Sequence, residues 1–78
     1  MSTIEQYKAL FVKTLQLDSN VKVENLAYRD HGWDSVAHMV LMATLEEAFD
    51  IMLDTDDVID FSSFEKGKEI LRKYDVEL

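Results

Sequence analysis

The chain is predicted to be an all-α protein, a small four-helix bundle with a long loop between helices 1 and 2 and a short third helix. Three observations predict this class. Apolar residues recur at helical spacing, no segment shows the sustained apolar–polar alternation of a strand, and capping residues stand where the periodic segments begin. With 78 residues and 47% apolar content, residues 1–78 are expected to form one domain, near the lower size limit for a hydrophobic core.

The first helix is expected from about Thr3 to Gln16. Ser2 or Thr3 can cap it, with Glu5 or Gln6 three positions later as the capping-box partner. Its apolar positions follow at helical spacing: Ile4, Tyr7, Leu10, Phe11 and Leu15. Residues 17–33 then form a long connection, which in so small a domain usually has a function or contains a short turn. Apolar residues can attach this connection to the core: Val21, Val23, Leu26 and Tyr28.

Three further helices are expected. The second spans about residues 34–49 and the third is a short segment at 55–59. The fourth begins at Ser62 or Ser63, with Glu65 as the capping-box partner of Ser62. Gly67 inside this helix costs about 1 kcal/mol relative to alanine. Its apolar positions are Phe64, Ile70, Leu71 and Tyr74.

The second helix has two apolar faces. At 100° per residue, one face contains His38, Leu41, Met42, Leu45 and Phe49, and the opposite face contains Val36, Met39, Val40 and Ala43. A helix that is apolar all round is normally buried, but three other helices, one of them short, can hardly cover both faces. We therefore expect the second stripe to contact a partner.

Acidic residues end the second helix and dominate the chain. Glu46, Glu47 and Asp50 oppose the helix dipole at this terminus, so we expect Glu46 and Glu47 to pair with basic partner residues, although a solvated end remains an alternative. Sixteen acidic against eight basic residues give a net charge of −8. This charge disfavours nucleic acid and favours partners with basic patches, or it serves solubility.

The segment GWDSVAHMVLMATLEEAFDI, residues 32–51, resembles the second helix of acyl carrier proteins. Their motif is Gly-x-Asp-Ser followed by an aliphatic residue or methionine, with Glu-Glu-x-Phe at the end of the helix. Both parts are present, as Gly32–Val36 and Glu46–Phe49. The length, the acidic charge and the order of helices extend the similarity over nearly the whole chain.

The resemblance implies that Ser35 is esterified with 4′-phosphopantetheine from coenzyme A, and that the terminal thiol holds acyl or aminoacyl groups as thioesters. It also implies that Asp34 supports the modification by helping the transferase engage its metal. The partners would be a phosphopantetheinyl transferase, a loading ligase or acyltransferase, and a synthase or transferase that consumes the cargo. A helix N-terminus suits a phosphate, although Asp34 or Ser35 could also be an ordinary N-cap.

The sequence departs from housekeeping fatty-acid carriers at two positions. These carriers usually have Leu before the motif glycine and an acidic residue about five positions after the serine, where this chain has His31 and Val40. The Trp-Asp-Ser-Val-Ala-His pattern instead resembles discrete carriers of specialised acyl or aminoacyl pathways. Fatty-acid, polyketide, peptidyl and D-alanyl transfer all remain open as pathways.

Two residues near Ser35 have alternative roles. His38 could line the mouth of an acyl pocket or contact the phosphate, or it could pack and satisfy one hydrogen bond. Trp33 could anchor the loop or contact a partner. Neither histidine has the neighbouring residues that acid–base catalysis or a metal site needs. We therefore expect a carrier that is not itself an enzyme and has no metal site. We also expect it to be a monomer.

Two other classes of protein compete with the carrier. Asp54–Glu65 superficially matches an EF-hand loop, but Val58 and Ile59 stand where the loop needs an oxygen ligand and a glycine. An acidic adaptor without a prosthetic group is the second alternative. The absence of cysteine, of a signal peptide and of a membrane-length apolar segment suits a cytoplasmic protein.

Overall fold

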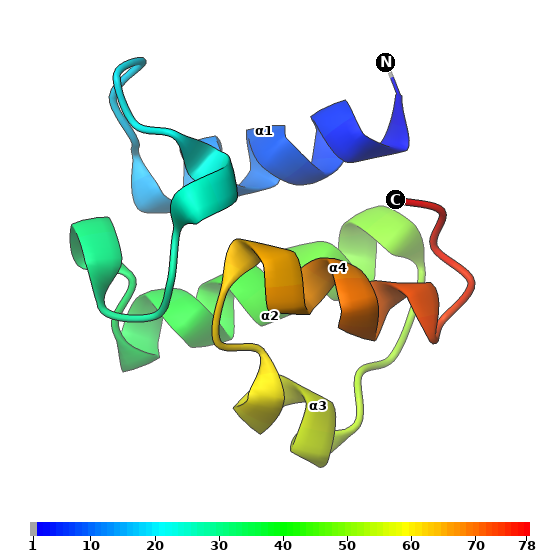
Figure 1. Ribbon diagram of the computed structural model, residues 1–78. Helices are drawn as coiled ribbons and strands as arrows, with labels where there is room; N and C mark the ends of the chain where they lie inside the picture. The colour runs from blue at the N-terminus through cyan, green and yellow to red at the C-terminus, as the bar shows by residue number, and fades with distance from the viewer. Residues whose placement is uncertain (1) are drawn as a thin grey trace.

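The computed structural model describes residues 2–78, which form an all-α bundle as predicted. Its four α-helices are α1 (Thr3–Leu15), α2 (Ser35–Phe49), α3 (Thr55–Asp60) and α4 (Phe64–Arg72), and its two short 3₁₀ helices are η1 (Val23–Asn25) and η2 (Asp30–Gly32). In Figure 1, α1 lies above α2 and α4, and the short α3 lies below them.

Side-chain caps fix where three of the helices begin. Ser2 accepts a hydrogen bond from the Glu5 amide at 3.2 Å, Asp34 caps α2, and Ser63 accepts one from the Lys66 amide at 2.9 Å. The prediction of a Ser62–Glu65 capping box is therefore wrong, because Ser63 is the cap and Glu65 is only the second residue of α4.

The core is built around aromatic rings from three segments. Tyr7 and Phe11 of α1 meet edge to face at 5.0 Å between ring centroids, and Phe11 meets Trp33 in the same way at 5.4 Å. Of the apolar positions at helical spacing in the sequence, Phe11, Leu41, Leu45, Phe64 and Ile70 are buried, whereas Phe49 is only partly buried.

The long connection is attached to the turn between α3 and α4. The Tyr28 amide donates to the Ser62 carbonyl at 2.9 Å, and the Phe64 amide donates to the Leu26 carbonyl at 2.9 Å. These bonds flank an isolated β-bridge between Ala27 and Ser63. The prediction of a short turn within the connection is confirmed by η1 and η2, and the backbone pairing holds the connection against the turn between α3 and α4.

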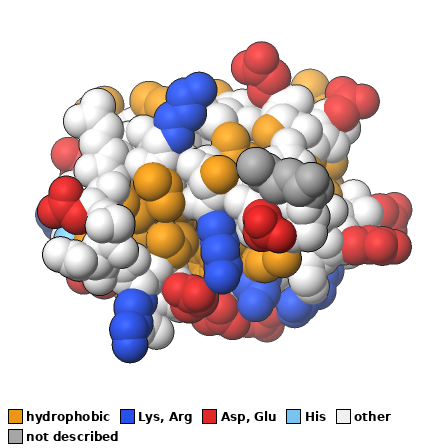
Figure 2. All heavy atoms as spheres, turned by 90° about the horizontal axis from the view of Figure 1, so that it is seen from above, with side chains coloured by type: hydrophobic (Ala, Val, Ile, Leu, Met, Phe, Trp, Pro, Cys, Tyr) orange, Lys and Arg blue, Asp and Glu red, His pale blue; other side chains and the backbone are white. Residues whose placement is uncertain are grey.

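The surface is strongly acidic but also has exposed apolar groups. On the face in Figure 2, acidic side chains project around the edge and apolar side chains are visible between them. None of the helices in residues 2–78 is sufficiently long and apolar to cross a membrane.

Gly67 marks the closest approach between α4 and its neighbours. A β-carbon added there would collide with the ring of Phe61 and with the Tyr7 hydroxyl. That hydroxyl donates to the Phe64 carbonyl at 2.8 Å, and burial, with the nearby charge of Glu65, raises the pKa of Tyr7 so that it stays a donor. Gly67 is therefore explained by packing.

We predict that Gly67→Ala lowers the free energy of unfolding by about 2 kcal/mol, because overpacking of the core outweighs the better helix propensity of alanine. Urea unfolding followed by circular dichroism measures this change. Glu69→Ala, at an exposed position of the same helix, is the control and should change stability by at most about 0.5 kcal/mol. A neutral or stabilising Gly67→Ala would contradict the packing explanation.

Candidate functional site

A left-handed turn brings the chain from the core to the start of α2. Arg29, His31 and Gly32 have φ values of 90°, 48° and 83°, and such values favour glycine and strain other residues. After this turn, Trp33 is fully buried, whereas Ser35 is exposed. The turn therefore exposes Ser35 to solvent two residues after Trp33, which is buried in the core.

The first turn of α2 shows which residue is the cap. Asp34 Oδ1 accepts the hydrogen bond of the Ala37 amide at 2.9 Å, so Ser35, the first residue of the helix, is not the N-cap. The first i to i−4 bond of α2 runs from the His38 amide to the Asp34 carbonyl. The amides of Ser35 and Val36 precede it and give this end a partial positive charge.

A surface hollow of about 360 Å³ lies beside Ser35, between α2 and α3. Its volume is at the small end of the roughly 300–1,000 Å³ range of small-molecule sites. Apolar groups from both helices line it together with the rings of His38 and Phe61: Met39, Val58 and Ile59. A group attached to Ser35 would therefore begin at the edge of an apolar hollow.

His38 occupies both of its ring nitrogens in hydrogen bonds. The Trp33 indole N–H donates to His38 Nδ1 at 2.9 Å, and His38 Nε2 lies 2.8 Å from the Val58 carbonyl oxygen. An indole only donates and a carbonyl only accepts, so the proton of the neutral ring is on Nε2. His38 thus packs against Trp33 and also lines the edge of the hollow. Trp33 anchors the loop in the core.

The first turn of α3 is attached to the residues that follow α4. Asp57 is 7% exposed and accepts a hydrogen bond from Lys73 Nζ at 2.6 Å and one from the Tyr74 hydroxyl. The same hydroxyl accepts the Asp54 amide at 3.0 Å. Tyr74, expected inside the fourth helix, lies just beyond Arg72, where α4 ends. The sequence indicated none of these bonds.

The two faces of α2 differ in burial. Leu41, Met42 and Leu45 are buried, and the opposite stripe is exposed: Val36 at 73%, Met39 at 61%, Val40 at 52%, and Ala43. We call these four residues the α2 stripe. At the helix end, Glu47 is exposed, but Glu46 is half-buried and its carboxylate accepts the Leu53 amide at 2.8 Å.

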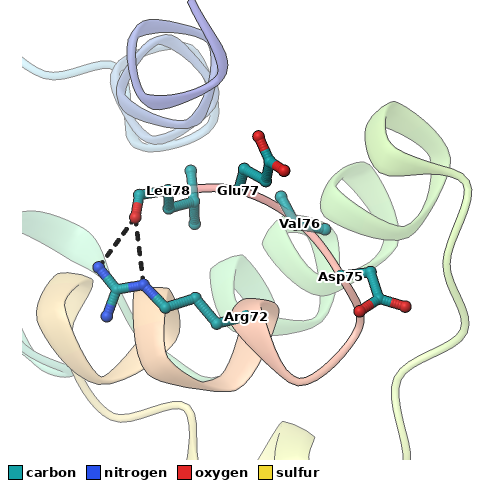
Figure 3. A pocket seen from close by; sticks show the side chains of 5 residues that line it. All are labelled: Arg72, Asp75, Val76, Glu77 and Leu78. Carbon is teal, nitrogen blue, oxygen red and sulfur yellow. Dashed lines mark hydrogen bonds between the residues drawn. The ribbon is translucent and has the colours of Figure 1, made fainter.

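Two other regions were candidates for a site: the acidic segment compared with an EF-hand, and a hollow near residue 78. The twelve residues compared with an EF-hand form α3, a turn and the start of α4, and residues 2–78 contain no group of three or more potential metal ligands. A separate hollow, shown in Figure 3, lies at the end of the chain, where Arg72 donates two hydrogen bonds to the Leu78 carbonyl at 3.0 and 3.1 Å. Ser35 does not line it.

Comparison with known proteins identifies one family. A family model described as "Phosphopantetheine attachment site" matches residues 8–66, more than half of the chain. The matched segment runs from α1 to the first turn of α4 and includes Ser35. No curated protein and no solved structure matches the chain.

The Asp57 cluster predicts a loss of stability in acid. Hydrogen bonds from Lys73 and then Tyr74 hold the pKa of Asp57 below its ordinary value of 3.8. The ionised carboxylate therefore stabilises the fold above about pH 4, and this contribution disappears as the pH falls through the lowered pKa. Asp57→Asn should be less stable than the parent near about pH 6, and the difference should shrink by about pH 2.5.

Urea midpoints at several pH values measure this effect. Asp56→Asn, at the exposed preceding position of α3, controls for the loss of one negative charge. A gap between Asp57→Asn and the parent that stays constant with pH would show that the carboxylate's charge does not stabilise α3.

Proposed function

The chain belongs to the phosphopantetheine attachment site family, and from this membership we propose that Ser35 is the residue to which 4′-phosphopantetheine is attached. Domains of this family are carrier domains, which interact with a phosphopantetheinyl transferase and with acyl-processing enzymes. The observation that supports Ser35 is its place: it is exposed at the start of α2, and Asp34 supplies the cap in its stead. Its hydroxyl is therefore available for esterification.

Attachment transfers the phosphopantetheinyl group from the phosphoanhydride of coenzyme A to the serine oxygen, and adenosine 3′,5′-bisphosphate leaves. The Ser35 hydroxyl loses its proton to a base of the transferase, its oxygen bonds to the phosphorus that bears pantetheine, and the bond from that phosphorus to the adenosine half of coenzyme A breaks. The chain's own contribution is to place the new phosphodiester at the positive end of α2, beside the amides of Ser35 and Val36. The arm supplies a thiol, which holds cargo as a thioester, to a chain without cysteine.

Asp34 is proposed to support the transfer. One of its carboxylate oxygens accepts the Ala37 amide, and the side chain remains exposed next to Ser35. Carboxylate oxygens are preferred ligands of Mg²⁺, so the second oxygen can face a metal in the transferase. In this arrangement the hydrogen bond from the Ala37 amide orients the Asp34 carboxylate, and coordination of the metal by that carboxylate holds the transferase next to Ser35.

The α2 stripe is the proposed contact surface for the partners. It begins next to Ser35 and exposes more than half of three large apolar side chains: Val36, Met39 and Val40. A partner that reaches Ser35 would cover this stripe, and Glu47 can add a charge contact at its end. Glu46 is a weaker candidate, because its carboxylate is bound to the Leu53 amide.

The proposed cargo is an acyl or aminoacyl thioester that partner enzymes load and consume, and the chain itself does not catalyse these steps. No acidic side chain stands in the first turn of α2, which supports a specialised acyl pathway over primary fatty-acid synthesis. An aminoacyl or peptidyl carrier is the alternative within the family. An adaptor that functions without the arm is the alternative outside it.

We predict that incubation with coenzyme A and a broad-specificity phosphopantetheinyl transferase adds the mass of one phosphopantetheine. Ser35→Ala should show no gain in an intact-mass measurement, because the attacking oxygen is missing. Ser62→Ala removes another exposed serine beside the same hollow and should gain the full mass. A parent chain that stays unmodified beside a modified control carrier would favour the adaptor.

The contact surface predicts a second result. Val40→Lys places a charge in the middle of the α2 stripe and should lower kcat/KM of the transferase about tenfold, mainly through KM. Val12→Lys alters a valine of similar exposure on α1 and should change kcat/KM by less than about twofold. Equal effects of the two variants would argue against the α2 stripe as the docking surface.

A further inference from the structure

Polar contacts made by two adjacent residues, Asp57 and Val58, attach α3 to the rest of the protein. The buried residue of this six-residue helix is Asp57, whereas Val58 is only half-buried and Ile59 is 72% exposed. The Asp57 carboxylate accepts hydrogen bonds from Lys73 and Tyr74. The next residue, Val58, is bound through its carbonyl by His38. With little apolar burial of its own, α3 depends on these hydrogen bonds for its position.

The hydrogen bond from His38 closes the side of α3 that faces Ser35. The Val58 carbonyl belongs to the last turn of α3, where carbonyls have no partner within the helix, and His38 Nε2 satisfies it at 2.8 Å. On the side of the ring facing the core, the Trp33 indole N–H donates to His38. The two rings are stacked, with 5.9 Å between their centroids and an interplanar angle of 23°. His38 therefore joins α2, α3 and the core at one point.

The space beneath the hollow is filled by aromatic rings. Trp33 is fully buried and Phe61 is 1% exposed, and His38 lies 6.2 Å from Phe61 between ring centroids. A close-packed interior of this kind has no room for a chain of methylenes. A long acyl chain could enter only if α3 moved away and the His38–Val58 bond broke.

We propose that His38 is a specificity-determining residue of this carrier. Its bond to Val58 keeps α3 closed on α2, so that the arm and a short acyl or aminoacyl group remain in the hollow beside Ser35. A long acyl chain is not taken into the core and stays in solvent. This inference rests on Ser35 being the attachment site, and it restricts the cargo to short or polar groups.

Two substitutions of His38 distinguish the effect of its hydrogen bond to Val58 from the effect of having any polar side chain at this position. The amide nitrogen of glutamine reaches the position of His Nε2, whereas that of asparagine reaches only the position of Nδ1. His38→Gln should therefore keep a donor to the Val58 carbonyl, and His38→Asn should lose it. Tyr7→Phe removes a buried hydrogen bond between α1 and α4, and it controls for a general loss of stability.

The experiment loads each variant of the 78-residue chain with butyryl- or dodecanoyl-phosphopantetheine, using the matching acyl-coenzyme A and the transferase, and confirms loading by mass. The rate of thioester cleavage by hydroxylamine then reports burial of the cargo. For the parent, His38→Gln and Tyr7→Phe, the dodecanoyl thioester should be cleaved no more slowly than the butyryl thioester. In His38→Asn, the dodecanoyl thioester should be cleaved about fivefold more slowly, which is the shift expected from one lost hydrogen bond.

The fluorescence of Trp33, the single tryptophan, gives a second readout. It should change on dodecanoyl loading in His38→Asn and stay constant in the parent. Slow cleavage of the dodecanoyl thioester in the parent, equal protection in Tyr7→Phe, or no difference between His38→Asn and His38→Gln would overturn the proposal. An absent mass gain would instead overturn Ser35 as the attachment site, and this proposal with it.

Discussion

Burial of the Trp33 indole is the constraint on which the rest of the site depends. The ring is fully buried against Phe11 of α1, and its N–H, which would be costly to leave unpaired in the core, is bound by His38. Ser35 follows two residues later and is exposed. The position of the Ser35 hydroxyl relative to Trp33 is thus fixed by one short segment and one capped helix start. Any group attached to Ser35 would emerge at a defined point on the surface.

The four helices are held together by two kinds of interaction. Aromatic and aliphatic burial joins α1, α2 and α4, with rings such as Tyr7 and Phe64 at 4.6 Å between centroids. Hydrogen bonds to Asp57 and from His38 attach α3 instead. Apolar packing tolerates little displacement, whereas a few hydrogen bonds of modest net strength can be exchanged with water. Movement in this protein is therefore expected to begin at α3, the helix that borders the hollow beside Ser35.

Periodicity and capping residues were sufficient to predict the architecture. The α2 stripe was predicted because a small bundle cannot cover both apolar faces of one helix, and its residues are exposed. The family resemblance pointed to Ser35 through a local motif, and local motifs survive without knowledge of the fold. What the sequence could not predict were contacts between distant residues, such as Asp57 with Tyr74 or Glu46 with Leu53. These depend on where a turn directs the chain, and no short-range pattern encodes that.

Gly67 and His38 show how such contacts change the interpretation of single residues. From the sequence, Gly67 weakens a helix; in the structure, it is the residue that lets α4 approach Phe61 and Tyr7. From the sequence, His38 could either pack in the core or line a pocket. In the structure it does both: its Nδ1 accepts a hydrogen bond from Trp33, and its Nε2 donates one to the Val58 carbonyl at the edge of the hollow. Because a single side chain joins the core anchor, the helix of Ser35 and the weakly packed α3, the capacity of the hollow and the stability of the site are coupled. If Ser35 bears the arm as proposed, substitution of His38 or of the Trp33 ring that supports it would be expected to alter what the hollow can hold.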